Sequence, residues 1–145
     1  VISSILIEEN SPGFCSVDGT VDSDNAGFTG VGFANTFNEL GKAINWSVDV
    51  PAAGTYKFTF VYANGADDNR WGRLDVNGSQ VDAKVDLNAT GTWSDYRPKE
   101  VNVELSTGRA NISLVSGTEG GLGNIDSLTI QSTTGGNAPT AVICN

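Results

Sequence analysis

The side chains in this sequence whose chemistry stands out are an indole, two carboxamides and a guanidinium, all in polar, glycine-rich stretches. They are Trp93, Asn64, Asn124 and Arg70. The C–H face of a pyranose packs on an indole ring, and its hydroxyl groups need donors and acceptors in fixed positions, which carboxamide and guanidinium groups supply. Trp93 lies among small and polar residues, so we expect it to be a stacking platform. If these side chains converge, the sequence predicts a sugar-binding site.

Each of these residues also has a purely structural interpretation. Trp93 could close the open end of the core instead of facing solvent, and the same alternative holds for Trp71. Asn64 and Asn124 could shape turns, which is the commonest use of asparagine. Arg70 could form a solvated ion pair with a neighbouring aspartate, and such a pair contributes little to stability.

A second group of residues is acidic. Asp126 shares the alternation of the apolar residues that follow it, so its carboxylate is expected to point inward at the start of a strand. Glu8, Glu9 and Asn10 follow another apolar strand. An inward carboxylate is costly unless a cation or hydrogen bonds satisfy it. If these two strands are neighbours, the oxygens could converge on calcium, which takes carboxylate and carbonyl ligands. Otherwise the carboxylates reach solvent at the strand ends.

Catalysis has little support in the composition. The chain has no histidine, which excludes Ser-His-Asp and Cys-His arrangements. A carboxylate pair for glycoside hydrolysis is compatible with the 17 acidic residues, but no pair stands out. We therefore expect no catalytic residue. Two alternatives to a sugar-binding module stay open: a small glycoside hydrolase or lyase, and a calcium-dependent structural or adhesion domain.

Charge and cysteine content narrow the partners and the compartment. The 145-residue chain has a net charge of −9, so its field repels phosphates, and we expect neither nucleic acid nor an anionic membrane as a partner. No apolar run is long enough to span a bilayer. Cys15 and Cys144 lack metal-site spacing, and a disulfide between them, in a secreted protein, is favoured over two buried thiols. We expect a secreted monomer.

Alternating apolar residues between glycine-rich turns predict an all-β sandwich of two antiparallel sheets. Trp46 alternates with apolar neighbours in residues 43–50, so we expect it in the core. Residues 1–132 are predicted to form this one domain. Residues 133–145 have the composition of a linker or tail, which a Cys15–Cys144 disulfide would pin.

The connections between the predicted strands alternate between short turns and long loops. The long loops cover residues 64–71, 88–98 and 116–124. Because successive antiparallel strands run in opposite directions, alternate connections emerge at opposite ends of the sandwich. All three long loops are therefore expected at one end, where their functional side chains can meet.

Several motifs resemble a known family. The stretch VPAAGTYKFTFVYANG at residues 50–65 resembles the signature of carbohydrate-binding modules of families 6, 35 and 36. The resemblance continues through LDVNG at 74–78, TGTW at 90–93 and GNIDSL at 123–128, and GFTGVGF at 27–33 is similar to the family's glycine-rich early loop. The order and spacing of these motifs are most similar to family 35.

The resemblance implies a β-jelly-roll that binds sugar through loops at one end and that accompanies a plant-cell-wall-degrading enzyme. Phe33 stands where related modules have tyrosine, so it can stack but cannot donate a hydrogen bond, and Trp71 stands where the family commonly has proline. The carbohydrate-binding residues implied by the matched motifs are Phe33, Asn64, Arg70, Trp71, Trp93 and Asn124.

The resemblance also implies a structural calcium, held by Asp126 and by an early acidic motif. That motif matches Glu8, Glu9 and Asn10, and the choice among the three is open. Family 35 members are similar in recognising uronic acids, some with a second calcium at the sugar. The aspartates available for a second calcium are Asp22, Asp24, Asp67, Asp68 and Asp95. We expect a non-catalytic module that brings a linked enzyme to hemicellulose or pectin, with glucuronic or unsaturated galacturonic acid as the ligand.

Overall fold

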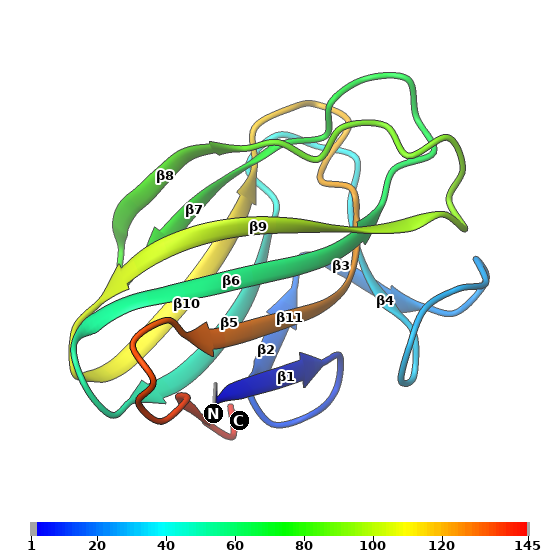
Figure 1. Cartoon of the computed structure of the whole chain (residues 1–145). Coiled ribbons are helices and arrows are strands. Elements are labelled where there is room, and N and C mark those ends of the chain that lie inside the picture. Colours follow the sequence, from blue (N-terminus) through cyan, green and yellow to red (C-terminus); the bar gives the residue numbers. More distant parts are fainter. Residues whose placement is uncertain (1–2, 145) are drawn as a thin grey trace.

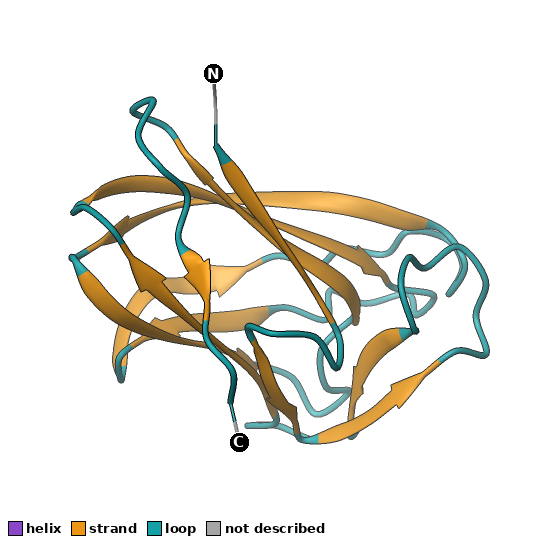
Figure 2. Ribbon diagram, turned by 90° about the horizontal axis from the view of Figure 1, so that it is seen from below, coloured by secondary structure: helices purple, strands orange, loops and turns teal. Residues whose placement is uncertain are grey.

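The computed structural model describes residues 3–144, which form two antiparallel sheets packed face to face (Figures 1 and 2). This arrangement is the predicted β-sandwich. The first sheet has the order β3 (Gly19–Asp22), β4 (Phe33–Thr36), β11 (Asn124–Ser132), β6 (Gly54–Ala63) and β9 (Tyr96–Leu105), and β1 (Ser4–Glu8) also pairs with β11. The second sheet has the order β12 (Thr140–Ala141), β5 (Ala43–Val50), β10 (Gly108–Ser116), β7 (Gly72–Val76) and β8 (Ser79–Val85), and β2 (Phe14–Val17) also pairs with β5. Within residues 3–144, no helix is long and apolar enough to cross a membrane.

The strands form where the side chains alternate between apolar and polar, because successive residues of a strand face opposite sides of the sheet. Along β6, every second side chain from Tyr56 to Tyr62 is buried, while Lys57 and Thr59 remain half-exposed. The turn between β7 and β8 places Asn77 and Gly78 at φ values of 51° and 80°. Both values lie in the left-handed region that a two-residue hairpin requires, which explains the choice of this dipeptide.

The core lies between the two sheets and is rich in aromatic and branched side chains. Trp46 of β5 is 1% exposed and packs on Phe60 of β6, with ring centroids 5.7 Å apart. The prediction that this tryptophan belongs to the core is therefore confirmed. Burial of large apolar side chains from both sheets is the main term that holds such a sandwich together.

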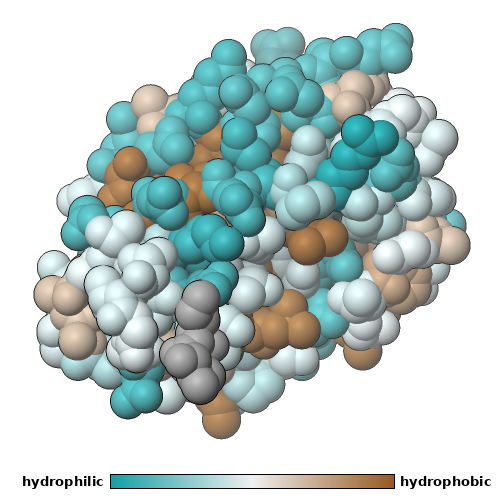
Figure 3. Space-filling model, viewed as in Figure 1, coloured by the Kyte–Doolittle hydropathy of each residue, from teal (hydrophilic) through white to brown (hydrophobic). Residues whose placement is uncertain are grey.

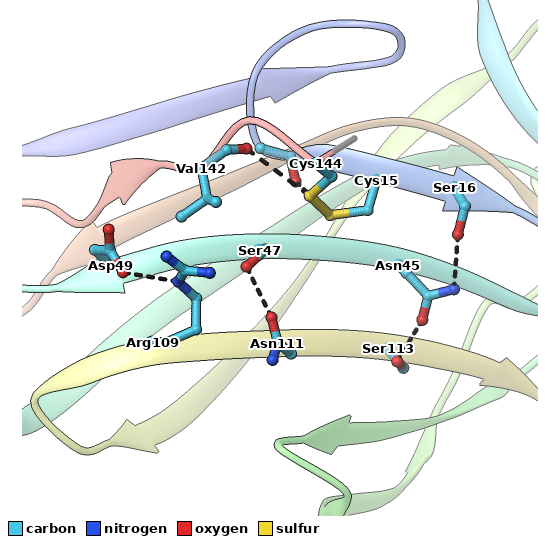
Figure 4. Close-up of a disulfide and its surroundings, with 11 residues drawn as sticks. Cys15, Ser16, Asn45, Ser47, Asp49, Arg109, Asn111, Ser113, Val142 and Cys144 are labelled. Atoms are coloured by element: carbon cyan, nitrogen blue, oxygen red, sulfur yellow. Dashed lines mark hydrogen bonds and ion pairs between the residues drawn. A yellow bond between two sulfur atoms is a disulfide. The ribbon is translucent and has the colours of Figure 1, made fainter.

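The C-terminal segment is fastened to the sandwich and does not leave it as a linker. β12 pairs with β5, and Cys15 and Cys144 form the predicted disulfide across 129 positions of sequence (Figure 4). The backbone nitrogen of Gly13 also donates to the oxygen of Val142 at 2.9 Å. The predicted spans 1–132 and 133–145 include residues 1, 2 and 145, which lie outside the described residues. Of the predicted linker, residues 140–144 belong to the sandwich.

Figure 1 shows the long connections that follow β6, β8 and β10 gathered at one end of the sandwich, away from both termini. The short turns after β5, β7 and β9 lie at the other end of their strands, as the antiparallel order requires. The face of the molecule seen in Figure 3 is mostly hydrophilic, with apolar side chains in small separate spots. The connections after β6, β8 and β10 are longer than joining two strands requires, and such loops commonly carry function.

Candidate functional site

The three long loops are tied to one another by hydrogen bonds. The backbone nitrogen of Thr90 donates to the oxygen of Asn64 at 2.8 Å, which joins the second loop to the first. Arg70 joins the first loop to the third, because its Nη1 donates to the oxygen of Gly120 at 2.6 Å and its own backbone oxygen accepts from Gly123 at 3.3 Å. The predicted common rim is confirmed.

A pocket of about 250 Å³ opens at this rim. It is lined by Asn25, Asn35, Asn38, Arg70, Trp93, Leu122 and Asn124. Three of the six residues predicted to bind sugar therefore meet in one place: the indole, one carboxamide and the guanidinium. Carboxamides from three further positions surround them, so the lining offers many neutral donors and acceptors beside one positive charge.

Arg70 is held in place on the pocket wall. Its Nε donates to Asp68 Oδ1 at 3.2 Å, in addition to the bond from Nη1 to Gly120, and its Cζ lies 5.9 Å from the ring centroid of Trp93. Asp68 is largely exposed, so this ion pair contributes little to stability. It is the solvated pair with a neighbouring aspartate that the sequence left open for Arg70. A guanidinium has five N–H donors, and these bonds leave the others free for a ligand.

The two predicted carboxamides have different surroundings. Asn64 is 0% exposed, its Nδ2 donates to the backbone oxygens of Asp68 and Leu87 at 2.8 Å each, and its Oδ1 accepts from Ala66 at 3.0 Å. Asn124 lines the pocket, and within residues 3–144 no side-chain hydrogen bond uses its carboxamide. Asn64 therefore organises the loop, and Asn124 is the carboxamide that can meet a ligand.

Two other residues predicted to contact sugar, Phe33 and Trp71, do not line this pocket. Phe33 is 0% exposed, and its ring packs against Phe28 and Tyr96 at centroid distances of 6.0 and 6.3 Å, so a sugar cannot reach it. Trp71 precedes β7 directly, and it does not line the pocket that Arg70 lines. The Trp71 ring lies on Gly117, where an added Cβ would stand 2.2 Å from it, and it lines a different pocket of about 510 Å³.

The sequence did not single out Asn25, Asn35 and Asn38, which also line the pocket. They lie in and around β4, outside the three long loops. The pairing of Ile125 with Ala34 places the start of β11 beside β4, and this register brings Asn35 next to Asn124. The available signal was the alternation of β4, which leaves Asn35 half-exposed between buried neighbours.

The acidic residues form a cluster beside the connection between β3 and β4, which Asp126 contacts at Thr29. Glu8, Glu9 and Asp126 each have one carboxylate oxygen that lies within 4.8 Å of those of the other two. The first and last long strands are neighbours, and the β1–β11 pairing, in which Glu8 faces Ser127, brings these residues together. Asp126 accepts hydrogen bonds at 3.0 Å from the backbone nitrogen and hydroxyl of Thr29.

The cluster fits a divalent cation. Both carboxylate oxygens of Glu9 and Oε1 of Glu8 are buried without a hydrogen-bond partner, which is costly for an ionised group. Burial raises the pKa of Glu9 from 4.5 to about 9, and the charges of Asp126 and Glu8 add to the rise. Asn10 is exposed in the turn after β1 and lines another pocket beside Cys15, so the structure leaves its side chain out of the cluster.

None of the aspartates considered for a second cation lines the pocket at the loop end. Asp68 and Asp95 form ion pairs with Arg70 and Arg97, and Asp22 accepts a hydrogen bond from Asn35 at 2.9 Å. Asp24 and Asp67 are exposed. The positive charge at the pocket therefore comes from Arg70 among the described residues that line it.

A β-sandwich with an aromatic, carboxamide-rich and arginine-bearing pocket at its loop end is the arrangement of a protein that binds sugars. The family model of carbohydrate binding module family 6 matches residues 14–132. The chain belongs to the carbohydrate-binding modules of the family 6 and 35 group and is most like family 35. Such modules are non-catalytic, so the chain is an ancillary binding module and not an enzyme.

Two curated relatives are enzymes of Cellvibrio japonicus. The chain is 42% identical over 127 residues to endo-1,4-beta-xylanase B and 42% identical over 127 residues to alpha-L-arabinofuranosidase C. Each match covers 87% of this chain but only 21% and 20% of the two enzymes. The chain thus spans about a fifth of the length of the curated relatives it matches.

Solved structures agree with this assignment. A family 35 module from Cellvibrio japonicus Abf62 superposes with a TM-score of 0.91 at 40% identity and covers 99% of this chain and 100% of its own. A family 35 module named Xyl-CBM35, solved in complex with a disaccharide that contains glucuronic acid, gives a TM-score of 0.90 at 40% identity and covers 97% and 99% of the two chains. The jelly-roll topology implied by the motifs is confirmed.

Proposed function

We propose that this module binds a uronic acid, glucuronic or unsaturated galacturonic, on hemicellulose or pectin. The observation that carries the proposal is the meeting of Trp93, Asn124 and Arg70 in one pocket. Trp93 supplies an aromatic face for the sugar ring, Asn124 a free carboxamide for its hydroxyls, and Arg70 the charge for its carboxylate. The complex of a 40% identical module with a disaccharide that contains glucuronic acid supports the same ligand class.

The net charge of the chain makes Arg70 the decisive residue for an acidic sugar. A protein of charge −9 repels an anion, so the carboxylate needs a local cation. Arg70 is that cation on the pocket wall, and its N–H donors that remain free can bind a carboxylate with two parallel hydrogen bonds. In this proposal Arg70 determines which sugars bind, and Trp93 contributes most of the contact area.

The module acts by tethering. Linked to a catalytic domain that degrades plant cell walls, it raises the local concentration of that domain on its polysaccharide. The relatives named xylanase and arabinofuranosidase, of which the matching part is about a fifth, support such a linkage. The Cys15–Cys144 disulfide supports a secreted protein, because disulfides persist in oxidising compartments. We propose that the module is a monomer.

The experiment is calorimetric titration with glucuronic acid and with glucose, which lacks the carboxylate. We expect the wild type to bind glucuronic acid and to prefer it to glucose by about tenfold or more. Arg70→Gln should remove most of this preference. Arg109→Gln is the matched control, because Arg109 pairs with Asp49 on the outer face of the second sheet (Figure 4) and should leave both titrations unchanged. Equal affinity of the wild type for the two sugars would refute uronic acid recognition.

We further propose that Glu8, Glu9 and Asp126 hold a structural calcium. Three carboxylates converge there, and three of their oxygens are buried without partners. When bound, calcium would neutralise these charges and fix the connection between β3 and β4 through its contact with Asp126. Melting in calcium and in chelator tests this site: calcium should raise the Tm of the wild type and of Glu119→Gln, an exposed control, but not that of Glu9→Gln. No calcium response in the wild type would remove the site.

A further inference from the structure

The indole of Trp93 lies directly on the main chain at Gly65. A Cβ added to Gly65 would stand 2.4 Å from Cδ1 of Trp93 and 2.6 Å from both Cγ and Nε1. These separations are far below van der Waals contact, so any side chain at position 65 would displace the pyrrole part of the ring. The φ of Gly65 lies outside the left-handed region. Glycine at this position is therefore needed for space and not for backbone conformation.

Gly120 stands in the same relation to Arg70. A Cβ added to Gly120 would lie 2.6 Å from Nε and 2.7 Å from Cζ of Arg70. The φ of Gly120 is also outside the left-handed region. The backbone oxygen of Gly120 accepts the 2.6 Å hydrogen bond from Arg70 Nη1, so the guanidinium lies against the glycine as well as bonding to it.

The contact at Gly65 and the contact at Gly120 are linked, because Arg70 lies against the ring of Trp93. The guanidinium carbon lies 5.9 Å from the ring centroid, and both side chains line the same pocket. The clashing atoms belong to side chains and not to the main chain: they are the pyrrole ring of Trp93 and the guanidinium group of Arg70. A side chain at position 65 or 120 would therefore shift the binding groups, and the cost would fall on sugar affinity more than on stability.

We propose that Gly65 and Gly120 are positioning residues of the sugar site: the missing side chain at each sets where the Trp93 ring and the Arg70 guanidinium lie. The affinity part of this inference rests on the proposed function, because it needs a sugar at the pocket. Gly65 sets the plane of the stacking platform. Gly120 sets the location of the charge that distinguishes an acidic from a neutral sugar.

The first test is Gly65→Ala in the intact chain. We expect its affinity for glucuronic acid to fall about tenfold, the size of a lost aromatic contact, while its Tm stays within about 3 °C of the wild type. In protein labelled with 5-fluorotryptophan, the ¹⁹F resonance of Trp93, assigned with Trp93→Phe, should move, and those of Trp46 and Trp71 should not. Gly54→Ala is the matched control, because a Cβ there meets no atom within 4 Å and its φ is also not left-handed.

A double-mutant cycle separates positioning from a general structural role. If Gly65 acts through the indole alone, adding Gly65→Ala to Trp93→Ala should not weaken sugar binding further. Gly120→Ala should instead narrow the preference for glucuronic acid over glucose, while the Trp93 resonance moves less than in Gly65→Ala. The affinities are compared only among variants whose Tm matches that of the wild type.

Two results would overturn the proposal. One is a Gly65→Ala protein with wild-type affinity and an unmoved Trp93 resonance. The other is a fall in Tm that accompanies and accounts for the loss of affinity, which would make Gly65 a folding residue. If the wild type binds no uronic acid, the proposed function fails, but the resonance shift on Gly65→Ala still decides whether this glycine positions the ring.

Discussion

Asn64 and Asn124 have the same side chain and lie at the same end of the sandwich, and the difference between them is hydrogen bonding. Asn64 makes two donor bonds and one acceptor bond to the main chain of its own and the next loop. Asn124 lines the pocket with its carboxamide unpaired within residues 3–144. A buried and satisfied amide is a structural element, whereas an unpaired amide at a cavity can exchange water for a ligand.

This contrast predicts opposite effects of the same substitution. Asn64→Ala should lower the free energy of unfolding by about 1–3 kcal/mol, because it leaves buried backbone groups without partners. Asn124→Ala should change stability little and reduce sugar affinity. Denaturant unfolding and calorimetric titration of both variants measure the two effects. The assignment fails if Asn124→Ala proves the more destabilising of the two.

The tryptophans of the first and second loops allow a matched comparison. Trp93→Ala should lower sugar affinity by about tenfold or more, because the platform is lost. Trp71→Ala should leave affinity unchanged, because its ring lies on Gly117 with Lys84 5.4 Å from the ring centroid, in another pocket. Affinity electrophoresis in glucuronoxylan measures both variants. Retention of Trp93→Ala at the wild-type level would contradict the platform.

At the scale of elements, the connection between β3 and β4 joins the acidic cluster to the pocket. It gives Asn25 to the pocket lining, and the backbone oxygen of Asn25 accepts from the Tyr96 hydroxyl at 3.1 Å. The same connection gives Thr29 to Asp126 and lays Gly30 against the Glu8 carboxylate. A change in the charge of the cluster is therefore expected to reach the pocket through this connection.

The shifted pKa of Glu9 predicts how the metal-free protein responds to pH. Because burial raises its pKa from 4.5 to about 9, the folded chain keeps this proton to a higher pH than the unfolded chain does. Linkage then requires the stabilising effect of this group to be present below pH 4.5 and to be lost as the pH rises towards 9.

In chelator, the Tm should accordingly fall between pH 5 and pH 9, within the interval that the pKa of about 9 sets, and Glu9→Gln should flatten this fall. Differential scanning calorimetry at several pH values measures it. If the Tm of the wild type instead rises over this pH interval, as steeply as the Tm of Glu9→Gln does, then Glu9 is not buried as the structure has it.

At the scale of the whole molecule, the disulfide and β12 fasten the C-terminal segment alongside β5 at the edge of the second sheet. The bond closes 129 positions of sequence, so it constrains most of the unfolded chain. Replacing Cys15 and Cys144 together by serine should lower the free energy of unfolding by about 2–5 kcal/mol.

Sugar affinity of this double variant should match the wild type at temperatures where it is folded, because the pocket that Arg70 and Trp93 line shares no lining residue with the cavity beside the disulfide. Guanidinium unfolding with and without reductant measures the stability, and the reduced wild type serves as the control. A folded double variant with weakened sugar binding would show that the disulfide region and the pocket are coupled.

Much of this architecture could be predicted from local pattern. The alternation in β6 and the Asn77–Gly78 hairpin are short-range signals, and the alternation of short and long connections follows from antiparallel order. These signals correctly placed Trp93, Arg70 and Asn124 at one rim. They could not show whether Phe33 faces the pocket or the interior, because that depends on its packing against Phe28 and against Tyr96, which comes from a distant segment.

The sequence by itself determined the sandwich, the disulfide partners and the kind of side chains at the loop end, because each depends on residue type and spacing along the chain. Only the tertiary structure decided which side chains are free to act. The pairing of Ile125 with Ala34 brings Asn35 to the pocket, and the first two long loops together satisfy Asn64, whereas the carboxamide of Asn124 has no such partners among residues 3–144. Availability to a ligand is set by contacts between segments far apart in sequence, and those contacts exist only once the sheets have packed.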